Sequence, residues 1–389
     1  MKILFNLAAT QPDSRAKHHG GGKYGITVFF ELLGRGADME CAVDSSRYLR
    51  EDVARALKDN NIPVVDLANA PMSEILRRKH YDVYYTPQIY PGVEIPDGTY
   101  YIGTHHGNRE LEMPADPLFG RYRASAYQRM RGRITRLFNN RWKKVQLKRL
   151  RSRLRDPKLH YVTVSEHTKY SILSYLPEIN ADDIKVFYSP STIAPASAKS
   201  VAPFDAGAPY VLLVSGNRTE KNALRVVMAM DELMSERPEI SVYKVVIAGA
   251  KEDAYDYKLK NREAFIFMGY VDEDTLESLY RGATLFAYPS LNEGFGYPPL
   301  EAMVHGVPVI ASPFTSIHEV CGDAALYFNP LDHKEIKGRL MRMLLDEGLR
   351  AEYGRRSFER FAVVNARQQR DLRLLADYIT DPHAVVSNG

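Results

Sequence analysis

The chain has 389 residues, of which 45% are hydrophobic, and it carries a formal net charge of +4. This length supports two cores, and 26% charged residues beside 25 tyrosines and 15 phenylalanines exclude intrinsic disorder. The two cysteines, Cys41 and Cys321, exclude a disulfide framework and a cysteine-rich metal site, and they fit a reducing cytoplasm.

The chain begins with an apolar run, MKILFNL, that we predict to be a buried strand. Asn6 interrupts this run and the polar sequence QPDSRAKHHGGG follows it, so the cleavage site of a signal peptide is missing. The ~20 consecutive apolar residues that a membrane-spanning helix needs do not occur. We therefore expect any membrane contact to be peripheral.

Short apolar runs alternate with helical patterns through the first half, among them GITVFFELLGRG, MECAVD, REDVARALKD, IPVVDL and DVYYTP. Such alternation is typical of an α/β fold with mainly parallel sheets. A glycine run at residues 18–25, HHGGGKYG, falls between the first strand and a helix. It lacks the GxGxxG spacing of a dinucleotide site.

A strongly basic segment follows at residues 121–160, with fifteen Lys or Arg and one acid, whereas the remaining residues are 37 basic and 47 acidic. Apolar side chains recur there at three- and four-residue steps, which predicts a long amphipathic helix. These side chains are Tyr127, Met130, Ile134, Phe138, Trp142 and Val145. Two interpretations stay open: a helix packed on its own domain, or contact of residues 121–158 with anionic lipid headgroups. Nucleic acid is disfavoured because no nucleic-acid module accompanies the charge.

A second α/β series begins at Tyr210 with YVLLVSG and continues through YKVVIAG, AFIFMGY, TLFAYPS and VPVIAS. The segment before it, residues 190–209, is rich in Pro, Ala and Ser and is predicted to be a linker. We therefore expect two Rossmann-like domains, 1–189 and 210–361. The helical pattern at 362–389 is long enough to cross back to the first domain.

The turn-rich stretch NEGFGYPPLEAM places Glu293 eight residues before Glu301. Pro298 and Pro299 suit the first turn of a helix, so we expect Glu293 in the preceding loop and Glu301 in the first or second helical turn. One interpretation is structural: the prolines and glycines shape a loop and both glutamates face solvent.

The other interpretation of this stretch is a ligand site. Gly294 and Gly296 let the backbone approach a ligand closely, and the helix start favours an anion. Carboxylates instead accept hydrogen bonds from hydroxyl groups. A ligand with both sugar and phosphate, such as a nucleotide sugar, could place its phosphate at the helix start and its hydroxyl groups at the two carboxylates.

Residues 292–332, NEGFGYPPLEAMVHGVPVIASPFTSIHEVCGDAALYFNPLD, resemble the signature of the family 4 retaining glycosyltransferases. The resemblance implies the GT-B fold, in which two Rossmann-like domains face each other across a deep cleft. By the family's E-x7-E motif, Glu293 would lie at the donor sugar and Glu301 would bind the ribose hydroxyls. The backbone of Phe295, Gly296 and Tyr297 would contact donor sugar and phosphate.

Two further segments of the second half resemble the family's donor domain. LLVSGNRTEKNALRVVMAM implies that Lys221 and Arg218 bind the diphosphate, although they are closer in sequence than the family's pair, and fixed cations would stabilise the departing anion. In FMGYVDEDTLESLY, Tyr270 corresponds to the position that meets the nucleobase through its backbone. The acids after it, Asp272, Glu273 and Asp274, suit a helix start, and the resemblance implies no metal cofactor.

In the first half, YYIGTHHGNRELEMP resembles the family's T-x-H-G segment. This implies that His106, or alternatively His105, lines the acceptor side, where an imidazole could hydrogen-bond hydroxyl groups. Gly21 and Gly22 would approach the diphosphate from the opposite wall. KVFYSPST departs from the family's asparagine-glycine turn, which leaves the geometry of the linker open.

The resemblance implies a retaining hexosyltransferase that uses a GDP- or UDP-linked sugar, and the basic segment suggests a lipid-linked glycan acceptor. We expect a role in surface polysaccharide or lipopolysaccharide biosynthesis in the cytoplasm, at the inner face of the membrane. The alternatives are a nucleotide-sugar epimerase, a glycan phosphorylase, or a non-catalytic sugar-binding module at the membrane. An NAD-dependent oxidoreductase is disfavoured because neither half has the glycine fingerprint.

Overall fold

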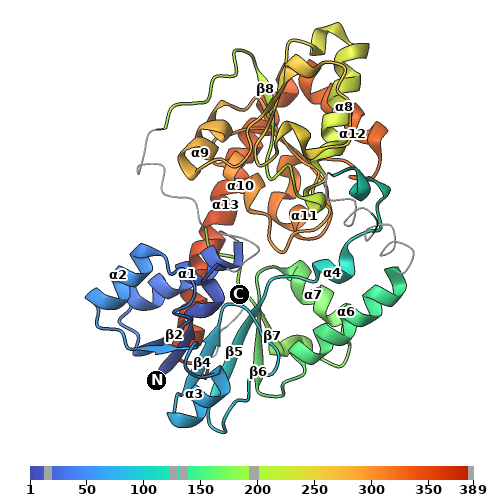
Figure 1. Cartoon of the computed structure of the whole chain (residues 1–389). Helices are drawn as coiled ribbons and strands as arrows, with labels where there is room; N and C mark the ends of the chain where they lie inside the picture. Colours follow the sequence, from blue (N-terminus) through green and yellow to red (C-terminus); the bar gives the residue numbers. More distant parts are fainter. Residues whose placement is uncertain (13–19, 123–129, 131–138, 192–200, 384–389) are drawn as a thin grey trace. The chain divides into compact units, whose positions relative to one another are not determined.

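The computed structural model describes residues 1–12, 20–122, 130, 139–191 and 201–383 (Figure 1). The chain divides into two compact units. Unit 1 is made of Met1–Asn108, Gln146–Thr192 and Asn365–Gly389, and unit 2 of Arg109–Val145 and Ile193–Val364. The expected domain bounds differ from this division at residues 109–145, which the prediction placed with the first domain.

Unit 1 contains a parallel sheet of seven strands in the order β3-β2-β1-β4-β5-β6-β7 among its described residues. The strands are β1 (Ile3–Asn6), β2 (Met39–Val43), β3 (Val64–Asp66), β4 (Val83–Thr86), β5 (Tyr100–His105), β6 (Leu159–Thr163) and β7 (Ile184–Val186). In the interior strand β1, Ile3 pairs with Met39 on one side and Val83 on the other. The first apolar run of the sequence is therefore a strand buried on both faces, as predicted.

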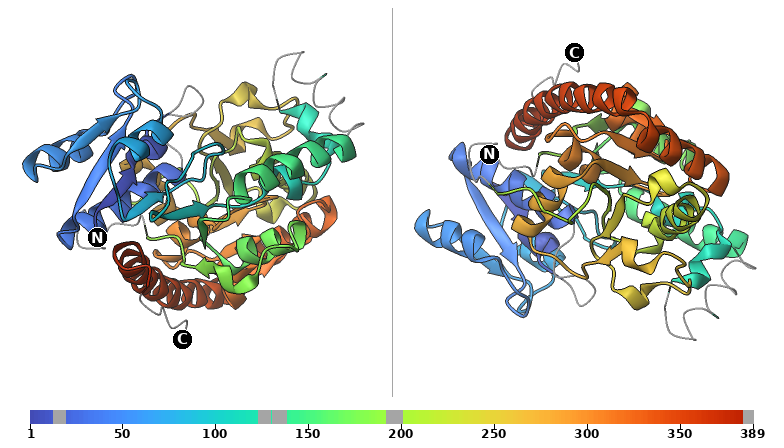
Figure 2. Two further views of the ribbon diagram at one scale, coloured as in Figure 1. Left: turned by 90° about the horizontal axis from the view of Figure 1, so that it is seen from below. Right: turned by 90° about the horizontal axis from the view of Figure 1, so that it is seen from above.

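The helices of unit 1 follow the alternation that the sequence predicted. They are α1 (Gly20–Gly34), α2 (Glu51–Asp59), α3 (Met72–Arg78) and α7 (Glu166–Tyr175), with short 3-10 turns at Leu7–Thr10 and Ala181–Asp183. Two helices contribute residues to both units, α6 (Asn139–Leu154) and α13 (Glu347–Thr380). α13 is one continuous helix of 34 residues, so the pattern recognised after residue 362 is the last part of a longer element (Figure 2).

Unit 2 contains a second parallel sheet, in which six described strands have the order β10-β9-β8-β11-β12-β13. The strands are β8 (Tyr210–Leu213), β9 (Lys244–Ile247), β10 (Phe265–Phe267), β11 (Leu285–Tyr288), β12 (Val309–Ala311) and β13 (Ala325–Tyr327). Its α-helices are α4 (Arg109–Glu112), α8 (Ala223–Glu236), α9 (Glu273–Gly282), α10 (Tyr297–Met303), α11 (Ser316–Cys321) and α12 (His333–Leu345). Two parallel α/β units confirm the predicted fold class.

The core of unit 2 lies between the sheet and the pair α8 and α12. α12 buries Ile336, Leu340 and Met343, at the three- and four-residue spacing of an amphipathic helix. α8 is buried nearly all round, because ten of its fourteen residues have little solvent exposure. These two helices hold the first strand of the unit, β8, and the loop after it in a fixed place.

Residues 109–122 belong to unit 2, although they come from the first half of the sequence. Asp116 accepts two hydrogen bonds from Arg225, at 2.5 and 2.8 Å, with both side chains buried. Tyr122 forms an antiparallel bridge to Tyr255, and its hydroxyl oxygen accepts from the backbone N–H of Leu224 at 3.1 Å. Residues 109–122 are thus an integral part of unit 2.

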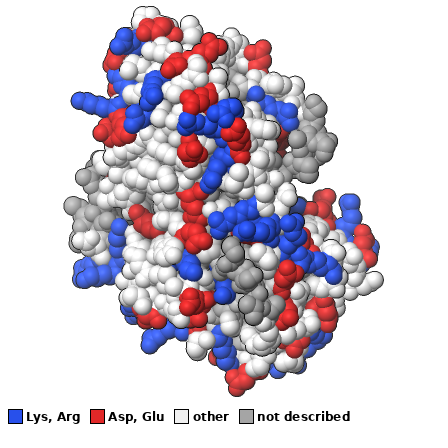
Figure 3. Space-filling view, turned by 180° about the vertical axis from the view of Figure 1, so that it is seen from behind, with Lys and Arg blue, Asp and Glu red and all other residues white. Residues whose placement is uncertain are grey.

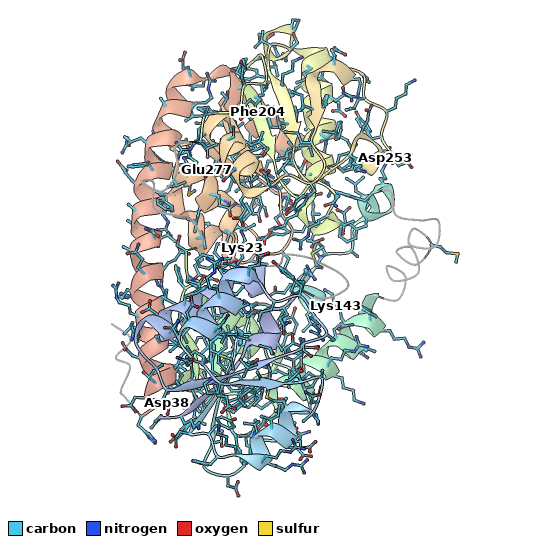
Figure 4. All side chains as sticks on the ribbon, turned by 60° about the vertical axis from the view of Figure 1, so that its left-hand side comes forward. Lys23, Asp38, Lys143, Phe204, Asp253 and Glu277 are labelled. Atoms are coloured by element: carbon cyan, nitrogen blue, oxygen red, sulfur yellow. The ribbon has the colours of Figure 1, made fainter. Side chains whose placement is uncertain are left out.

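The basic helix is described from Asn139, so Tyr127, Ile134 and Phe138 lie outside the described residues. Over its described length α6 carries seven Lys or Arg and no acid. Gln146, Leu150 and Leu154 are buried, whereas Trp142 and Val145 are 37% and 46% exposed. α6 carries Lys143, which Figure 4 labels. In the described part of the chain, no helix is long and apolar enough to span a membrane.

Candidate active site

The candidate site in unit 2 forms at the carboxyl ends of β8 and β11. These strands are parallel neighbours in the sheet, so the loops that follow them meet at one edge. The first loop carries Lys221 and the second carries Glu293. Lys221 Nζ donates a hydrogen bond to Glu293 Oε1 at 2.6 Å, so two predicted site residues 72 positions apart form an ion pair.

The loop after β8 has a backbone that fixes the position of Lys221. A Cβ on Gly216 would lie 2.5 Å from Ile247 Cγ2, so the close approach of this loop to β9 requires glycine. Asn222 adopts the left-handed conformation at φ +57°, and its side-chain N–H group donates to the carbonyls of Pro289 and Pro330. Lys221 therefore projects from a 3-10 turn, Thr219–Lys221, that is tied to the loop after β11.

Glu293 is held by donors on one of its two carboxylate oxygens. Besides Lys221, the hydroxyls of Tyr288 and Ser290 each donate to Oε1 at 2.6 Å. No hydrogen bond from a described residue reaches Oε2. The backbone is also fixed, since the N–H of Glu293 donates to Thr315 Oγ1 at 2.9 Å and its carbonyl accepts from Ser316 Oγ at 3.0 Å.

Electrostatics keep this carboxylate ionised. Burial opposes ionisation of Glu293, but the Lys221 cation and the hydrogen bonds from Lys221, Ser290 and Tyr288 outweigh it, so the pKa of Glu293 is lowered. The pKa of Tyr288 is raised by burial and by the neighbouring Glu293 charge. Tyr288 is therefore a permanent hydrogen-bond donor at neutral pH, and the pair is charged.

Arg218, the second predicted cation, is bound to a carboxylate that the sequence analysis did not select. Its Nε and Nη2 donate to Glu220 Oε1 at 2.9 and 2.5 Å. The same oxygen accepts from Arg109 Nη1 at 3.0 Å. Burial would raise the pKa of Glu220, but the Arg218 charge, a backbone hydrogen bond and the Arg109 charge lower it. Two arginines thus flank one ionised carboxylate beside Lys221.

The turn-rich loop has the local structure that its prolines and glycines predicted. α10 begins at Tyr297, with Gly296 as N-cap at φ +110° and proline in the first turn. Phe295 is buried, and its carbonyl accepts from Ser316 Oγ at 2.8 Å. Glu293 is in the loop and Glu301 is in the second turn, which confirms both placements. Gly294 is partly buried.

Glu301 and Tyr270 belong to different elements of unit 2: Glu301 is in α10, and Tyr270 is in the loop after β10. Glu301 Oε2 accepts from the hydroxyl of Tyr280 at 2.8 Å. Tyr270 follows β10 and is 83% exposed. Asp272 is the N-cap of α9, and its carboxylate accepts from the backbone N–H of Thr275 at 2.7 Å. The interpretation of these acids as residues of a helix start is confirmed.

The predicted residues of the first half belong to unit 1. Gly21 and Gly22 lie in the first turn of α1, because the helix already begins at Gly20. His106 Nε2 is 2.7 Å from the carbonyl oxygen of Pro87, and its ring packs edge-on against Tyr24 with centroids 4.8 Å apart.

The neighbouring histidine has a different environment. His105 is buried, with Nε2 2.8 Å from Asn108 Oδ1, and Asn108 in turn donates to Ser171 Oγ at 2.8 Å. These hydrogen bonds hold the His105 ring in place inside the unit. His106 is partly exposed, so it is the better candidate for contact with a substrate.

Sequence reasoning missed most of the residues that hold Glu293 and Arg218: Tyr288, Ser290, Thr315, Ser316, Glu220 and Arg109. Four of these follow or end strands β11 and β12. The rule that parallel strands present their carboxyl ends at one edge could have found them. Arg109 carries no comparable signal, because it lies more than a hundred residues before its partner.

A family model described as "Glycosyl transferases group 1" matches residues 197–360. This range contains Arg218, Lys221, Glu293 and Glu301. The match covers less than half of the chain, and it is to this segment that the likeness to group 1 glycosyl transferases applies. The E-x7-E resemblance thus coincides with the domain that the family model recognises, and Arg109 lies outside the matched residues although it packs in the same unit.

Curated relatives of part of this chain are named as glycosyltransferases. The chain is 37% identical over 147 residues to "O-antigen chain mannosyltransferase B" of Escherichia coli, a match that covers 36% of this chain and 38% of that one. The chain spans less than half the length of the curated relatives that it matches first.

Solved structures show the fold of the whole chain. WaaG, "a glycosyltransferase involved in lipopolysaccharide biosynthesis", is 14% identical with a TM-score of 0.65, and the match covers 97% of this chain and all of WaaG. Anabaena Alr3699/HepE "in complex with UDP-glucose" is 16% identical with a TM-score of 0.59, covering 97% and 100% of the two chains. Both likenesses confirm that the two α/β units have the GT-B fold.

Proposed function

We propose that the protein is a retaining glycosyltransferase that transfers a hexosyl unit from a nucleotide diphosphate sugar to a glycan hydroxyl. The observation that carries this proposal is the buried pair of Lys221 and Glu293 at the carboxyl edge of the sheet in the group 1 domain. A cation and a carboxylate side by side suit a ligand that combines phosphate with sugar hydroxyls.

In the proposed reaction the bond between the anomeric carbon and the diphosphate oxygen breaks first. Lys221 and Arg218 neutralise charge on the departing diphosphate. The acceptor oxygen then bonds the anomeric carbon from the same face, and its proton passes to a leaving phosphate oxygen. Glu293 orients the sugar by accepting a hydroxyl hydrogen bond at Oε2, and Glu301 accepts from the ribose. The mechanism requires no metal ion.

The remaining predicted contacts complete this proposal. The backbone of Gly294 to Tyr297 contacts sugar and phosphate, and the backbone at Tyr270 contacts the nucleobase. In unit 1, His106 hydrogen-bonds a hydroxyl of donor or acceptor, and Gly21 and Gly22 approach the diphosphate.

The donor that we propose is a GDP- or UDP-linked hexose, used in surface polysaccharide or lipopolysaccharide biosynthesis. Support comes from the mannosyltransferase names of the relatives and from the HepE complex with UDP-glucose. An epimerase would turn over the donor without acceptor, and a phosphorylase would need inorganic phosphate. Neither alternative has a supporting observation of its own.

We also propose that α6 holds the protein against anionic lipid at the cytoplasmic face of the membrane. Arg141, Lys144 and Lys148 are exposed on this helix, and the apolar Trp142 and Val145 are exposed among them. Such a combination favours an interfacial position, with each cation near the surface contributing about 1 kcal/mol. On the face shown in Figure 3, Lys and Arg side chains lie among Asp and Glu in many places and form a contiguous band at mid-height.

The proposed function is tested with the purified chain and a panel of nucleotide sugars. A thermal-shift screen against UDP, GDP, ADP and TDP identifies the nucleotide, because a ligand of the native state raises the melting temperature. Transfer is then measured for the wild type, Glu293→Gln and Glu301→Gln, with Glu335→Gln on α12 as a matched surface control. We expect at least a tenfold loss in the two site variants, about 1.4 kcal/mol of transition-state stabilisation. Normal transfer by both would contradict the site assignment.

A further inference from the structure

The short helix α4 contacts both loops of the candidate site. Arg109 at its first position donates to Glu220 Oε1 at 3.0 Å, in the loop after β8. Glu112 at its last position accepts from Asn292 Nδ2 at 2.7 Å, in the loop after β11. Residues three apart lie on one face of a helical turn. A single turn from outside the group 1 domain thus bridges the two loops that carry Lys221 and Glu293.

Glu220 connects Arg109 to the rest of the site. Its Oε1 accepts from both Arg109 and Arg218, and it is the residue directly before Lys221. Its backbone carbonyl accepts from the N–H of Leu291 at 2.8 Å, and Ser290 Oγ lies 3.2 Å from the same carbonyl oxygen. The Ser290 hydroxyl donates its one proton to Glu293 Oε1, so these contacts link Arg109, through Glu220 and Ser290, to the Glu293 carboxylate.

The position of Arg109 is fixed by the rest of its segment. The buried pair of Asp116 and Arg225 and the bond from Leu224 to Tyr122 hold residues 109–122 on unit 2. The Arg109 side chain itself is 49% exposed, so its guanidinium is accessible from solution. A cation on a fixed backbone with an exposed head group is suited to meet an anionic ligand.

We infer that Arg109 binds the diphosphate of the donor, together with Arg218 and Lys221, and that Glu220 positions both arginines. This inference rests on the proposed function. Arg109 donates one hydrogen bond, from Nη1 to Glu220. A guanidinium has five N–H donors in a planar fork whose geometry matches phosphate oxygens. Arg109 and Arg218 share one carboxylate, Glu220, so their remaining N–H donors can meet phosphate oxygens.

The simplest competing role for Arg109 is an ordinary surface ion pair with Glu220. Such a pair contributes little to stability and nothing to nucleotide affinity. The two roles predict different behaviour of one variant, Arg109→Gln, which removes the charge from an exposed side chain and leaves the backbone unchanged.

The test is isothermal titration of the full chain with the nucleoside diphosphate that the thermal-shift screen selects. We expect Arg109→Gln to bind about tenfold more weakly, as for loss of one charge-assisted hydrogen bond, with an unchanged melting temperature. Arg109→Lys should recover part of the affinity. The loss should shrink as salt is raised, because salt screens an exposed ionic contact. The matched control is Arg355→Gln, which removes a similar arginine paired to Glu359 on α13.

The outcomes separate this inference from the proposed function. If the wild type binds the diphosphate and Arg109→Gln binds it equally well, the role of Arg109 is wrong and the proposed function stands. A lowered affinity accompanied by a lowered melting temperature, with no rescue by lysine, would show a structural role and would also overturn the inference. If the wild type binds none of the nucleoside diphosphates, both fail.

Discussion

Replacing Lys221 with methionine measures how much the ion pair with Glu293 contributes to the stability of unit 2. The two side chains are only 7% and 14% exposed, so the variant leaves a buried carboxylate without its cation. Removing one partner of a buried pair costs about 3–5 kcal/mol. Tyr288 and Ser290 still donate to the carboxylate, so we expect the lower end, about 3 kcal/mol.

The pH dependence of this loss has a definite sign. In the wild type the pKa of Glu293 is lowered: burial opposes this, but Lys221 outweighs it. The pair therefore contributes stability above the unfolded pKa, about 4.3, and this contribution is lost as pH falls through the folded pKa. Without Lys221, burial would raise the pKa of Glu293, so the variant regains stability as pH falls and the carboxyl group takes up a proton. The difference between the two proteins should be larger at pH 8 than at pH 5.

Differential scanning calorimetry at both pH values is the assay. For a domain of this size 1 kcal/mol shifts the melting temperature by about 2–4 °C, so we expect a drop of about 6–12 °C at pH 8. Glu293→Gln combined with Lys221→Met should recover part of it, because no buried charge remains. Lys337→Met, which breaks a more exposed pair with Glu236, is the control and should change little. A drop below 2 °C, or one that does not depend on pH, would refute the reasoning.

Three further predictions follow from the packing. Asp116→Asn leaves the buried guanidinium of Arg225 without its carboxylate and should destabilise unit 2 by about 3–5 kcal/mol, measured as a lower melting temperature. Gly216→Ala places a Cβ within 2.5 Å of Ile247 Cγ2 and should lower both the melting temperature and nucleotide affinity, because it displaces the loop that carries Lys221. The thiols of Cys41 and Cys321 should react with a thiol reagent at pH 8 only after unfolding, since both are buried and burial raises the pKa of Cys321 to about 12.

Each of these predictions has a control and a contrary outcome. The control for Asp116→Asn is Glu239→Gln, which removes a surface carboxylate from unit 2 and should leave the melting temperature of the chain unchanged. Gly34→Ala adds a methyl group where nothing lies within 4 Å, so a similar loss in both glycine variants would contradict the steric argument. Rapid labelling of a native thiol would show that the strand or helix carrying it opens readily.

The fold could be predicted from the sequence because its signals are local. Buried parallel strands appear as continuous apolar runs, and the run around Leu4 forms a buried interior strand of its sheet, as expected. Pro298 and Pro299 marked the start of α10 for reasons of backbone geometry alone. These elements are fixed by short-range sterics and hydrophobicity.

The detailed site could not be predicted, because it depends on contacts between residues far apart in the sequence. Nothing near Glu220 in the sequence indicates that Arg109 shares its carboxylate, and nothing near Arg225 indicates Asp116. The alternating pattern gives the order of strands but no information on where a connecting segment packs. In the basic segment, the spacing of apolar residues likewise did not predict which side chains are buried, since Trp142 and Val145 are exposed whereas Gln146 is buried.

The docking of residues 109–122 on unit 2 also limits how this protein can be recombined with its relatives. A chimaera joined at the interdomain linker would take residues 210–364 of unit 2 from one parent and Asp116 from the other. Arg225 and Leu224 would then face a foreign segment, and the surface that Tyr122 covers would meet side chains that did not evolve with it. Exchange of donor specificity therefore requires two crossover points upstream of the linker, one on each side of this segment.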